Sequence, residues 1–465
     1  MATRWPRSGS ASRTCSVSPS SAALAHTEGC SLISVDTCVE GRAGSPPSSA
    51  ADTTMNVLSR QQRIVQGHGP QDAPELRPVN SAATAVIHSV RLISSGLDLP
   101  AAFVVFRNGR VLATGTGSDW RDLAGDGADV VDGTGQVLTP GLLDIHNHGG
   151  AGASYADGGE AIRTARRLHR QHGITRQLLS LVTALPDDLI SQLHLAAAEI
   201  RRDPTILGIH LEGPFLARQY CGAHDPAFLR DPDPELVERL LSAADGTLRQ
   251  VTMAPERHHF AESAQILGDA GVVVAVGHTA ATFEQARAAI DAGATLLTHA
   301  FNAMPGLHHR APGPVLAFVE DTGGWLEVIN DGVHVRPEVI RMLGRLAPGR
   351  VALVSDAMAA AGVGDGRYRL GRLDVDVASG VARLTRENSI AGSTVTLDVA
   401  IASAVQEVGL TPLAAIEAAT TVPAQILGVE DRFGRLEPGY VADAVLFDSD
   451  WQVRDVWIDG RPVGE

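Results

Sequence analysis

The central part of the chain alternates short apolar runs with longer segments of helical periodicity. Runs with the length and composition of buried strands lie at 142–145, 174–183, 206–211, 248–254, 272–277, 296–298, 325–329 and 351–355. Helical periodicity marks the segments 161–172, 186–201, 234–243, 283–292 and 337–346. Strands that alternate with helices form parallel sheets, and about eight such units match a (β/α)8 barrel. The pattern therefore predicts an α/β fold built on a TIM-like barrel.

Both flanks of this region carry short β-branched runs separated by glycine turns. Residues 85–137 contain an Asn108-Gly109 turn, and the C-terminal segment repeats this chemistry at Asp459-Gly460. We therefore predict one small β-sandwich domain formed by both chain ends. The predicted division is a disordered N-terminal extension at 1–79, a first β-sandwich segment at 80–137, the barrel core at 138–366, a β-sandwich insertion at 367–388, a helical completion of the barrel at 389–428, and a final β-sandwich segment at 429–465.

The first 79 residues are rich in Ser, Ala, Pro and Gly and show no sustained apolar period. Such a segment buries too little surface to offset the entropy of ordering, so we expect it to be disordered. The alternative is that the chain starts at a later methionine such as Met55, and the sequence leaves both interpretations open.

Composition excludes several classes of function. The formal net charge of -15 leaves no basic face for nucleic acid or a membrane surface. The chain contains no lysine, which excludes a Schiff-base lysine, a P-loop lysine and a carbamylated lysine between two metal ions. No apolar run is long enough for a membrane span or a signal peptide, so a cytoplasmic location is expected.

The cysteines do not form a disulfide framework. Cys15, Cys30 and Cys38 lie in the N-terminal region, and Cys221 stands alone in the segment after the third predicted strand. We prefer to interpret Cys221 as a small packing residue, and the alternative is a redox-sensitive thiol near the site.

Polar side chains that suit metal binding follow five of the predicted strands at their C-terminal ends. Active sites of this barrel lie on that rim. The two side chains of an H-x-H pair in an extended segment point to the same side, where both can bind one metal ion. Each histidine alone could be a core residue, and the glutamate alone a turn cap, but together they predict a metal site for zinc or iron. The six residues are His146, His148, Glu212, His278, His299 and Asp356.

Several motifs in this order resemble a known family. They are PGLLDIHNHGG, HLEGPFLA with GAHDP, VTMAPE, GHT, THAFNAMPGLHHRAPG, NDGVHV, VSDAMAAAG and AGST. This set is similar to the amidohydrolase superfamily and, within it, to the N-acetylglucosamine-6-phosphate deacetylases, over roughly residue 85 to the C-terminus. The resemblance implies a metal-bearing barrel with a β-sandwich from both chain ends, as the pattern above predicts.

The resemblance also implies a role for each motif residue. Glu212, His278 and His299 would hold the main metal, with His146 and His148 at a second ion that Glu212 bridges and Asp356 touches. Asp356 would act as general base and then general acid, and His334 would polarise the acetamide carbonyl. A second interpretation of His334 is a cap on the following helix. The implied substrate contacts are Ala223, His224, Asn302, Ala303, Arg310, Asp331, Gly332, Val333, His334, Ile390, Ala391 and Gly392.

The resulting hypothesis is a metal-dependent hydrolase that converts N-acetylglucosamine 6-phosphate to glucosamine 6-phosphate and acetate in amino-sugar catabolism. Zinc is the expected ion, with iron as the alternative and one or two ions per subunit. The resemblance also implies a homodimer in which Arg310 reaches the phosphate in the neighbouring subunit's site, a task that suits a guanidinium because it can bind phosphate bidentately. A surface charge is the other interpretation of Arg310.

Three other functions stay open at this point. The same chemistry could act on N-acetylgalactosamine 6-phosphate, since the choice of epimer depends on a few contacts. A cyclic-amide hydrolase of the same superfamily is disfavoured by the missing lysine and by the His308-His309-Arg310 segment. A catalytically inactive barrel that serves as an assembly protein is disfavoured because all the expected ligands are retained.

Overall fold

The computed structural model describes residues 84–464 of the chain. The predicted disorder of residues 1–79, the alternative start at Met55, and the three N-terminal cysteines lie outside the described residues. Within the described range, the barrel and the sheet of the chain ends belong to one compact unit.

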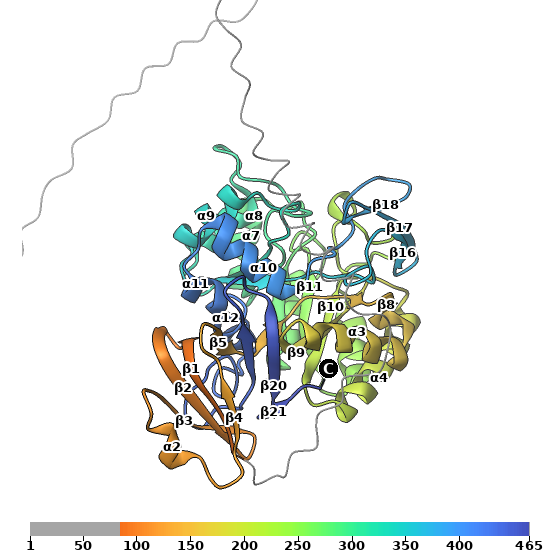
Figure 1. Cartoon of the computed structure of the whole chain (residues 1–465). Helices are drawn as coiled ribbons and strands as arrows, with labels where there is room; N and C mark the ends of the chain where they lie inside the picture. Colours follow the sequence, from red (N-terminus) through yellow and green to blue (C-terminus); the bar gives the residue numbers. More distant parts are fainter. Residues whose placement is uncertain (1–83, 465) are drawn as a thin grey trace, which may run out of the picture. The chain divides into compact units, whose positions relative to one another are not determined.

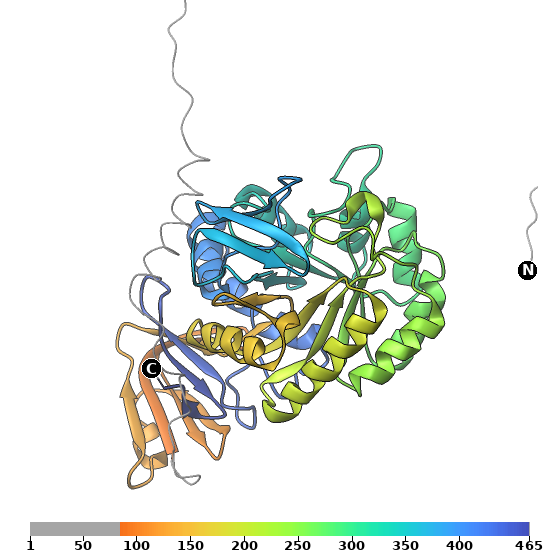
Figure 2. The same cartoon turned by 90° about the vertical axis from the view of Figure 1, so that its right-hand side faces the viewer.

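A parallel sheet of eight strands forms the barrel (Figures 1 and 2). All eight predicted strands are present, and their spatial order follows the sequence. Nearly all of their residues are buried, which is why they read as continuous apolar runs. They are β6 (Leu142–Asp144), β9 (Ile174–Val182), β10 (Ile206–Glu212), β11 (Leu248–Met253), β12 (Val273–Val276), β13 (Leu296–Leu297), β14 (Trp325–Ile329) and β15 (Val351–Val354).

Helices surround the barrel strands, as Figure 2 shows for the yellow and green segments. The five predicted helices are present, whereas α6 and α8 were not predicted. The sequence of α8, GPVLAFVE, is apolar on most sides because most of the helix is buried, so it lacks the amphipathic period that marks a surface helix. The helices are α3 (Gly159–Gln171), α4 (Pro186–Arg202), α5 (Pro234–Ala244), α6 (Phe260–Asp269), α7 (Phe283–Asp291), α8 (Gly313–Glu320) and α9 (Pro337–Leu346).

The C-terminal helices follow the barrel strands and complete the helical layer. They are α10 (Leu397–Ser403), a π-helical turn (Ala404–Val408), α11 (Pro412–Glu417) and α12 (Thr421–Ile426). Buried residues of α10 and α11 pack against Leu142, Ile174 and Leu353 of the barrel. The largest apolar core of the described chain lies between the barrel strands and helices α3 to α9.

The first and last barrel strands meet at a seam without a β-ladder between them in the described chain. On the site side, the backbone N–H of Asp356 donates to the carbonyl of His146 at 2.8 Å. On the opposite side, two carbonyls of the segment after α11 take the place of strand partners. The carbonyl of Ala418 accepts from Leu353 N at 2.8 Å, and that of Ala419 accepts from Leu143 N at 2.9 Å.

Strands from both chain ends join in a second sheet of eight strands (Figure 1). The order is β21-β20-β19-β5-β1-β2-β3, with β4 also paired to β1. This confirms a β-domain built from both ends, although its strands form one hydrogen-bonded sheet folded around a shared apolar core. Its elements are β1 (Thr84–Ser94), β2 (Leu97–Arg107), β3 (Arg110–Thr116), α2 (Trp120–Leu123), β4 (Asp129–Asp132), β5 (Val137–Pro140), β19 (Ala444–Phe447), β20 (Val453–Ile458) and β21 (Arg461–Pro462).

The prediction that residues 367–388 join this β-domain is wrong. Strands β16 (Gly366–Leu370), β17 (Leu373–Ala378) and β18 (Val381–Leu384) form a separate three-stranded sheet, seen in light blue in Figure 2. Its apolar side packs against Met358, Ala223 and Val182, which follow or end barrel strands. The physical reason is that alternation of apolar and polar residues identifies strands but does not say which sheet they join.

Two short strands and two 3₁₀ turns complete the loops on the site side. The strands β7 (Gly149–Gly150) and β8 (Ala153–Ser154) form a small hairpin, and the turns are at Tyr155–Asp157 and Arg218–Tyr220. None of the described helices combines the length and the apolar composition that a bilayer crossing requires.

Candidate metal centre and active site

Three barrel strands bring one carboxylate and two imidazoles together. Glu212 ends β10, His278 follows β12 and His299 follows β13, and all three are buried. The Oε1 atom of Glu212 lies 3.0 Å from Nε2 of His278 and 3.0 Å from Nε2 of His299, and the two nitrogens are 3.0 Å apart. This triangle of potential ligand atoms could hold a metal ion.

A second group lies beside the first. Nε2 of His146 is 3.2 Å from Nε2 of His148, as expected for an H-x-H pair that points to one side. Oδ1 of Asp356 is 3.1 Å from Nε2 of His148 and 3.6 Å from Nε2 of His146. These three residues form the second candidate metal group.

Glu212 faces both groups with its two oxygens. Oε1 lies 3.4 Å from Nε2 of His146, and Oε2 lies 3.2 Å from Nε2 of His148. The carboxylate therefore contacts histidines of the first group and of the second. The structure brings together all six residues that the strand-end pattern singled out.

The backbone at three of these positions is in the left-handed region. The φ angles are 46° at His278, 27° at His299 and 47° at Asp356. Such conformations cost about 1–3 kcal/mol each for residues other than glycine, and they cluster at functional sites. Each of the three residues lies just past a barrel strand, so the strained turn aims its side chain into the centre.

Hydrogen bonds to the far side of each ring orient several of the histidines. Nδ1 of His278 is 2.9 Å from the carbonyl of Tyr220, and Nδ1 of His148 is 3.2 Å from the carbonyl of Ser180. Nδ1 of His146 contacts Glu327, described below. A ring that donates from Nδ1 keeps the lone pair of Nε2 for the centre. Nδ1 of His299 is buried without a hydrogen-bond partner among the described residues.

His224, which was expected to contact the substrate, lies in direct contact with two residues of the first candidate metal group. Its Nε2 is 3.3 Å from Oε2 of Glu212, and its Nδ1 is 2.9 Å from the hydroxyl of Thr183. The ring meets that of His278 edge to face, with centroids 4.7 Å apart. Burial lowers the pKa of His224 to about 4 despite the carboxylate of Glu212, so the ring is neutral at pH 7.

The carboxylates of the centre favour a positive charge beside them, as the pKa values of their neighbours show. Burial alone would lower the pKa of His148, yet hydrogen bonds to Asp356 and Glu212 raise it to about 9. Burial likewise opposes ionisation of Glu212, but the rings of His146 and His278 hold its pKa well below the usual value. A bound cation would balance the negative charge of these carboxylates while the imidazole rings stay neutral. Imidazole nitrogens and carboxylate oxygens are a donor set that suits a divalent transition metal, so the residues fit such an ion.

Asp331 and His334 form a hydrogen-bonded pair in the turn that precedes α9. Oδ1 of Asp331 accepts from the N–H groups of Val333 and His334 at 2.9 and 2.8 Å, and Oδ2 is 2.7 Å from Nδ1 of His334. Burial lowers the pKa of His334, but Asp331 and then Asp356 outweigh it and raise that pKa above 6.5. His334 thus has a partner at Nδ1 and a preference for the protonated form.

Five more of the residues with implied substrate contacts lie in three places. Ala223 is buried under the three-stranded sheet. Asn302 and Ala303 lie in the turn after His299, where Asn302 Nδ2 donates to the carbonyl of His299 at 3.1 Å. Gly332 and Val333 belong to the Asp331 turn.

The segment Ile390 to Gly392 lies against Asp356. The N–H of Ser393 donates to the carbonyl of Asp356 at 2.7 Å. Gly392 has a φ of 62°, and a Cβ there would lie 3.1 Å from that carbonyl oxygen. Both the positive φ and this close approach favour glycine at the position. Ala391 is buried and Ile390 half-buried.

Arg310 lies apart from the candidate metal groups. Its side chain is exposed, and its Nη1 contacts Nε2 of the neighbouring His309 at 2.6 Å. The single chain therefore does not bring Arg310 into the centre, and its expected role across a subunit interface stays a prediction.

Two buried polar residues next to the centre had no predicted role. Glu327 of β14 contacts His146, and His210 of β10 lies between the hydroxyls of Ser180 at 2.9 Å and Thr252 at 2.8 Å. In the sequence, both could have been noticed as titratable residues inside an apolar strand. Such a residue is costly to bury without a partner, so its presence indicates one.

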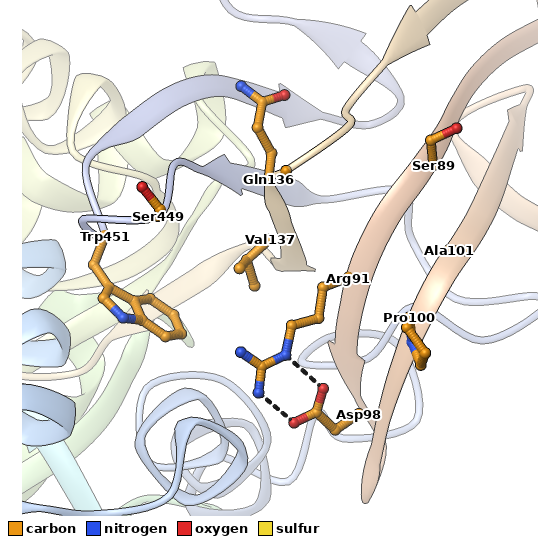
Figure 3. A pocket seen from close by; sticks show the side chains of 10 residues that line it. Ser89, Arg91, Asp98, Pro100, Ala101, Gln136, Val137, Ser449 and Trp451 are labelled. Carbon is orange, nitrogen blue, oxygen red and sulfur yellow. Dashed lines mark hydrogen bonds and ion pairs between the residues drawn. The ribbon is translucent and has the colours of Figure 1, made fainter.

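A surface pocket of about 740 Å³ lies elsewhere, on the chain-end sheet (Figure 3). Arg91 and Asp98 meet there in a bidentate pair at 2.7 Å for each contact, with Trp451 on the far side. The charges of this pair satisfy each other, and none of the candidate site residues lines the pocket. It does not contribute to the candidate centre.

Comparison with known proteins places the chain among metal-dependent hydrolases. The Amidohydrolase family matches residues 137–463. The N-acetylgalactosamine-6-phosphate deacetylase of Escherichia coli O157:H7 is 38% identical over 330 residues, which cover 70% of this chain and 87% of that protein. The N-acetylglucosamine-6-phosphate deacetylase of Bos taurus is 35% identical over 343 residues, covering 71% and 84%.

Solved structures agree in fold and in sequence. The N-acetyl-D-glucosamine-6-phosphate deacetylase of Mycobacterium smegmatis, in a mutant form bound to N-acetyl-D-glucosamine-6-phosphate, matches with a TM-score of 0.78 and 40% identity. The match covers 83% of this chain and all of that one. The corresponding Thermotoga maritima enzyme is 28% identical with a TM-score of 0.72 over 81% of this chain and 99% of its own. With the family matched from residue 137 to 463, the chain belongs to the amidohydrolase family.

Proposed function

We propose that the protein hydrolyses N-acetyl-D-glucosamine 6-phosphate to D-glucosamine 6-phosphate and acetate. The observation that carries the proposal is the contact of Glu212 Oε1 with both His278 Nε2 and His299 Nε2 at 3.0 Å, with Asp356 at the same centre. Relatives with 34–40% identity over most of their length bear the name of this deacetylase. The substrate would be a small phosphorylated amino sugar, and the place in metabolism would be amino-sugar breakdown.

The amidohydrolase family depends on divalent metal ions, and the described residues include two groups that fit one. Glu212, His278 and His299 would hold the first ion, and His146, His148 and Asp356 a second, with Glu212 between them. We favour zinc because the donors are nitrogen and oxygen in small groups, and iron is the alternative. When bound, such an ion supplies a Lewis acid that lowers the pKa of a bound water from about 15.7 to about 7.

Asp356 is the residue that we propose moves the proton. Its Oδ1 lies at the edge of the centre, 3.1 Å from His148 Nε2. Burial raises the pKa of Asp356, but His148 and His146 outweigh burial and lower it, so the group is a carboxylate that can accept a proton. It would take the proton of the attacking water and then deliver it to the leaving amine. General acid–base action of this kind contributes typically about 10²–10⁴-fold.

His334 would stabilise the acetamide oxygen as charge develops on it. Its Nδ1 is held by Asp331 at 2.7 Å, which leaves Nε2 to donate a hydrogen bond. Removing one such donor typically costs about 10²–10³-fold in kcat. Asp331 orients His334 and keeps it charged, so it acts through His334.

Substrate binding would use the turns that surround the centre. Ala223, His224, Asn302, Ala303, the Asp331 to His334 turn and the Ile390 to Gly392 segment are the proposed contacts. Arg310 would bind phosphate in the site of a second subunit, which makes the enzyme a homodimer. Its exposure and its place in an exposed loop support this role, since a side chain that reaches a neighbour must project from its own surface. A cytoplasmic location stays a prediction of the sequence.

The test is acetate release from N-acetylglucosamine 6-phosphate by protein loaded with Zn²⁺, beside the same sugar without phosphate. Asp356→Asn should lower kcat at least about 100-fold, while Asp126→Asn, at an exposed position, should leave it unchanged. Arg310→Ala should raise KM for the phosphorylated sugar and leave the rate on the unphosphorylated sugar as it was. No release from metal-loaded wild type would refute the proposal, and a protein that binds no metal when it is supplied would favour an assembly role.

A second candidate substrate is N-acetylgalactosamine 6-phosphate. The observation that favours it is the 38% identity to the Escherichia coli enzyme named for that sugar. The two sugars differ only at the C4 hydroxyl, so both can use the same centre. The ratio of kcat/KM for the two epimers, measured on one preparation, decides between them.

A further inference from the structure

Strand β14 carries one acid into the barrel interior. Glu327 lies in the middle of the run WLEVI, and its side chain is fully buried. Its carboxylate contacts Nδ1 of His146 at 2.9 Å, Nε2 of Gln250 at 2.9 Å and the backbone N–H of His299 at 3.2 Å. None of these partners carries a permanent positive charge. Burying a carboxylate in this way is unfavourable unless its partners are well placed. The three contacts of Glu327 therefore matter for their effect on His146 and His299.

The contact with His146 fixes the direction of that ring. Because Glu327 is an acceptor at Nδ1, the ring carries its proton there and presents the lone pair of Nε2 on the opposite side. That side faces the centre, with His148 Nε2 at 3.2 Å and Glu212 Oε1 at 3.4 Å. Glu327 therefore selects the tautomer of His146 that can bind a cation.

Other contacts keep Glu327 itself in place. Gln250 on β11 donates its amide N–H to Oε1, and its own Oε1 is buried without a hydrogen-bond partner among the described residues. The amide group of Gln250 thus donates to the carboxylate of Glu327, while the amide oxygen of Gln250 has no partner among the described residues. The backbone carbonyl of Glu327 accepts from Ala300 N at 2.8 Å, which ties β14 to the turn that carries His299.

We propose that Glu327 is a positioning residue that makes the group of His146, His148 and Asp356 a functional cation site. It lies behind His146 and acts on the centre through that ring. The inference rests on the proposed function, because it deepens the account of the same centre. It predicts that the second ion depends on Glu327, whereas the ion at Glu212, His278 and His299 depends on it less, through one backbone hydrogen bond.

Two variants isolate this effect. Glu327→Gln keeps the volume and leaves an oxygen for His146 and His299, but removes the charge. Gln250 can rotate its amide to offer the unpaired Oε1 to the new N–H group, so the hydrogen bonds can be preserved. Glu238→Gln on α5, an exposed position, is the matched control.

The measurement is the number of Zn²⁺ ions bound per chain and the affinity of each, by competition with a chelator after metal removal. Wild type and Glu238→Gln should bind two ions. Glu327→Gln should keep one at the wild-type affinity and lose about 10- to 100-fold in affinity for the other, the range seen when partners of metal-bound histidines are removed. His146→Gln should lose at least as much affinity for the same ion, and the double variant should lose no more than His146→Gln.

The outcomes separate the inference from the function. A second ion held as tightly by Glu327→Gln as by wild type overturns the inference, as does a wild type that binds only one. A double variant that loses much more than His146→Gln also overturns it, because Glu327 would then act by another route. If the ions behave as expected but wild type releases no acetate, the inference stands and the proposed function fails.

A folding defect would not hide the answer. The far-UV circular dichroism of each metal-free variant is compared with that of metal-free wild type. Should Glu327→Gln unfold, Glu327→Leu combined with Gln250→Leu takes its place, because removing both partners together avoids leaving the amide N–H unpaired. Loss of only the second ion in that variant supports the inference, and two tightly bound ions overturn it.

Discussion

One neighbouring carboxylate, that of Asp331, contributes most to the preference of His334 for its protonated form. Burial alone lowers the pKa of an imidazole, and Asp331 is the main group that raises the pKa of His334. The pair is also the shortest contact of His334, at 2.7 Å. At the residue scale, the substitution Asp331→Asn therefore tests the proposed role of His334 without touching the ring.

We expect Asp331→Asn to move the alkaline limb of kcat to lower pH. A raised pKa means that His334 keeps its proton until the pH rises through that value. Without the carboxylate the pKa falls, so the protonated form is lost at lower pH and kcat on the alkaline side of the profile drops. The pH profile of kcat from pH 6 to 9 measures the shift, with Asp126→Asn as control. An unchanged alkaline limb would mean that the charge of His334 plays no part.

Single residues show how far the sequence alone could lead. The six strand-end residues of the candidate metal groups could be found because each lies at the end of an apolar run and the barrel brings strand ends together. Glu327 could only be flagged as an acid inside such a run, because its partner His146 is 181 positions away and no local pattern links them. The 3.3 Å contact of His224 with Glu212 also depends on how a long loop folds back, which periodicity does not encode.

At the scale of elements, a buried ion pair joins two helices. His172, at the C-terminal end of α3, lies 3.0 Å from Asp398 in the first turn of α10. Burial opposes both charges. Even so, Asp398 raises the pKa of His172 above 6.5, and His172 lowers the pKa of Asp398 below 3.8. The pair therefore contributes to stability in a defined range of pH.

We expect Asp398→Asn to lower Tm by several degrees at pH 6 and by less at pH 9. The contribution of His172 is fully present below its unfolded pKa of about 6.5 and is lost as the pH rises through its raised folded pKa. The contribution of Asp398 is present above about 3.9 and is lost only as the pH falls through its lowered folded pKa. Thermal unfolding at the two pH values gives the comparison with wild type.

The exposed His194 on α4 provides a control for this experiment, and His194→Asn should leave Tm unchanged at both pH values. An equal loss of Tm at pH 6 and pH 9 in Asp398→Asn would show that the pair acts only as a neutral hydrogen bond.

Secondary-structure elements were predicted best where a sequence pattern is compatible with only one structural environment. The barrel strands and five helices follow from apolar runs and helical periods. The three strands β16 to β18 were found as strands but assigned to the wrong sheet, because their alternating pattern equally suits any half-buried sheet. Their apolar side meets Met358 and Ala360, and only the folded barrel places those residues there.

At the scale of the whole molecule, Arg176 connects the barrel to the chain-end sheet. This residue of β9 donates to Asp443 at 2.6 and 3.0 Å and to Asp459 at 2.7 Å, and its guanidinium lies over Phe433. Arg176 and Asp443 are both buried. Breaking a buried pair from one side leaves an uncompensated charge, which typically costs about 3–5 kcal/mol.

We expect Arg176→Met to destabilise the protein by about 3 kcal/mol or more, and addition of Asp443→Asn to recover much of that loss. Arg239→Met, which breaks the exposed pair of Arg239 with Asp187, should change stability by less than about 1 kcal/mol. Thermal unfolding of the four proteins at pH 7 makes the comparison. A double variant no more stable than Arg176→Met would mean that Arg176 matters through packing on Phe433 instead.

The seam between β15 and β6 has a consequence for how the protein is made. The eighth strand ends at Val354, yet the carbonyls that fill the gap belong to Ala418 and Ala419. At about 5–20 residues per second, a ribosome reaches them about 3–13 s after that strand. During this interval the nascent chain holds two unpaired strand edges, which are sites of aggregation. His146 and Asp356, which belong to the second candidate metal group, stand on opposite sides of the same gap, so closing the seam also brings the members of that group together.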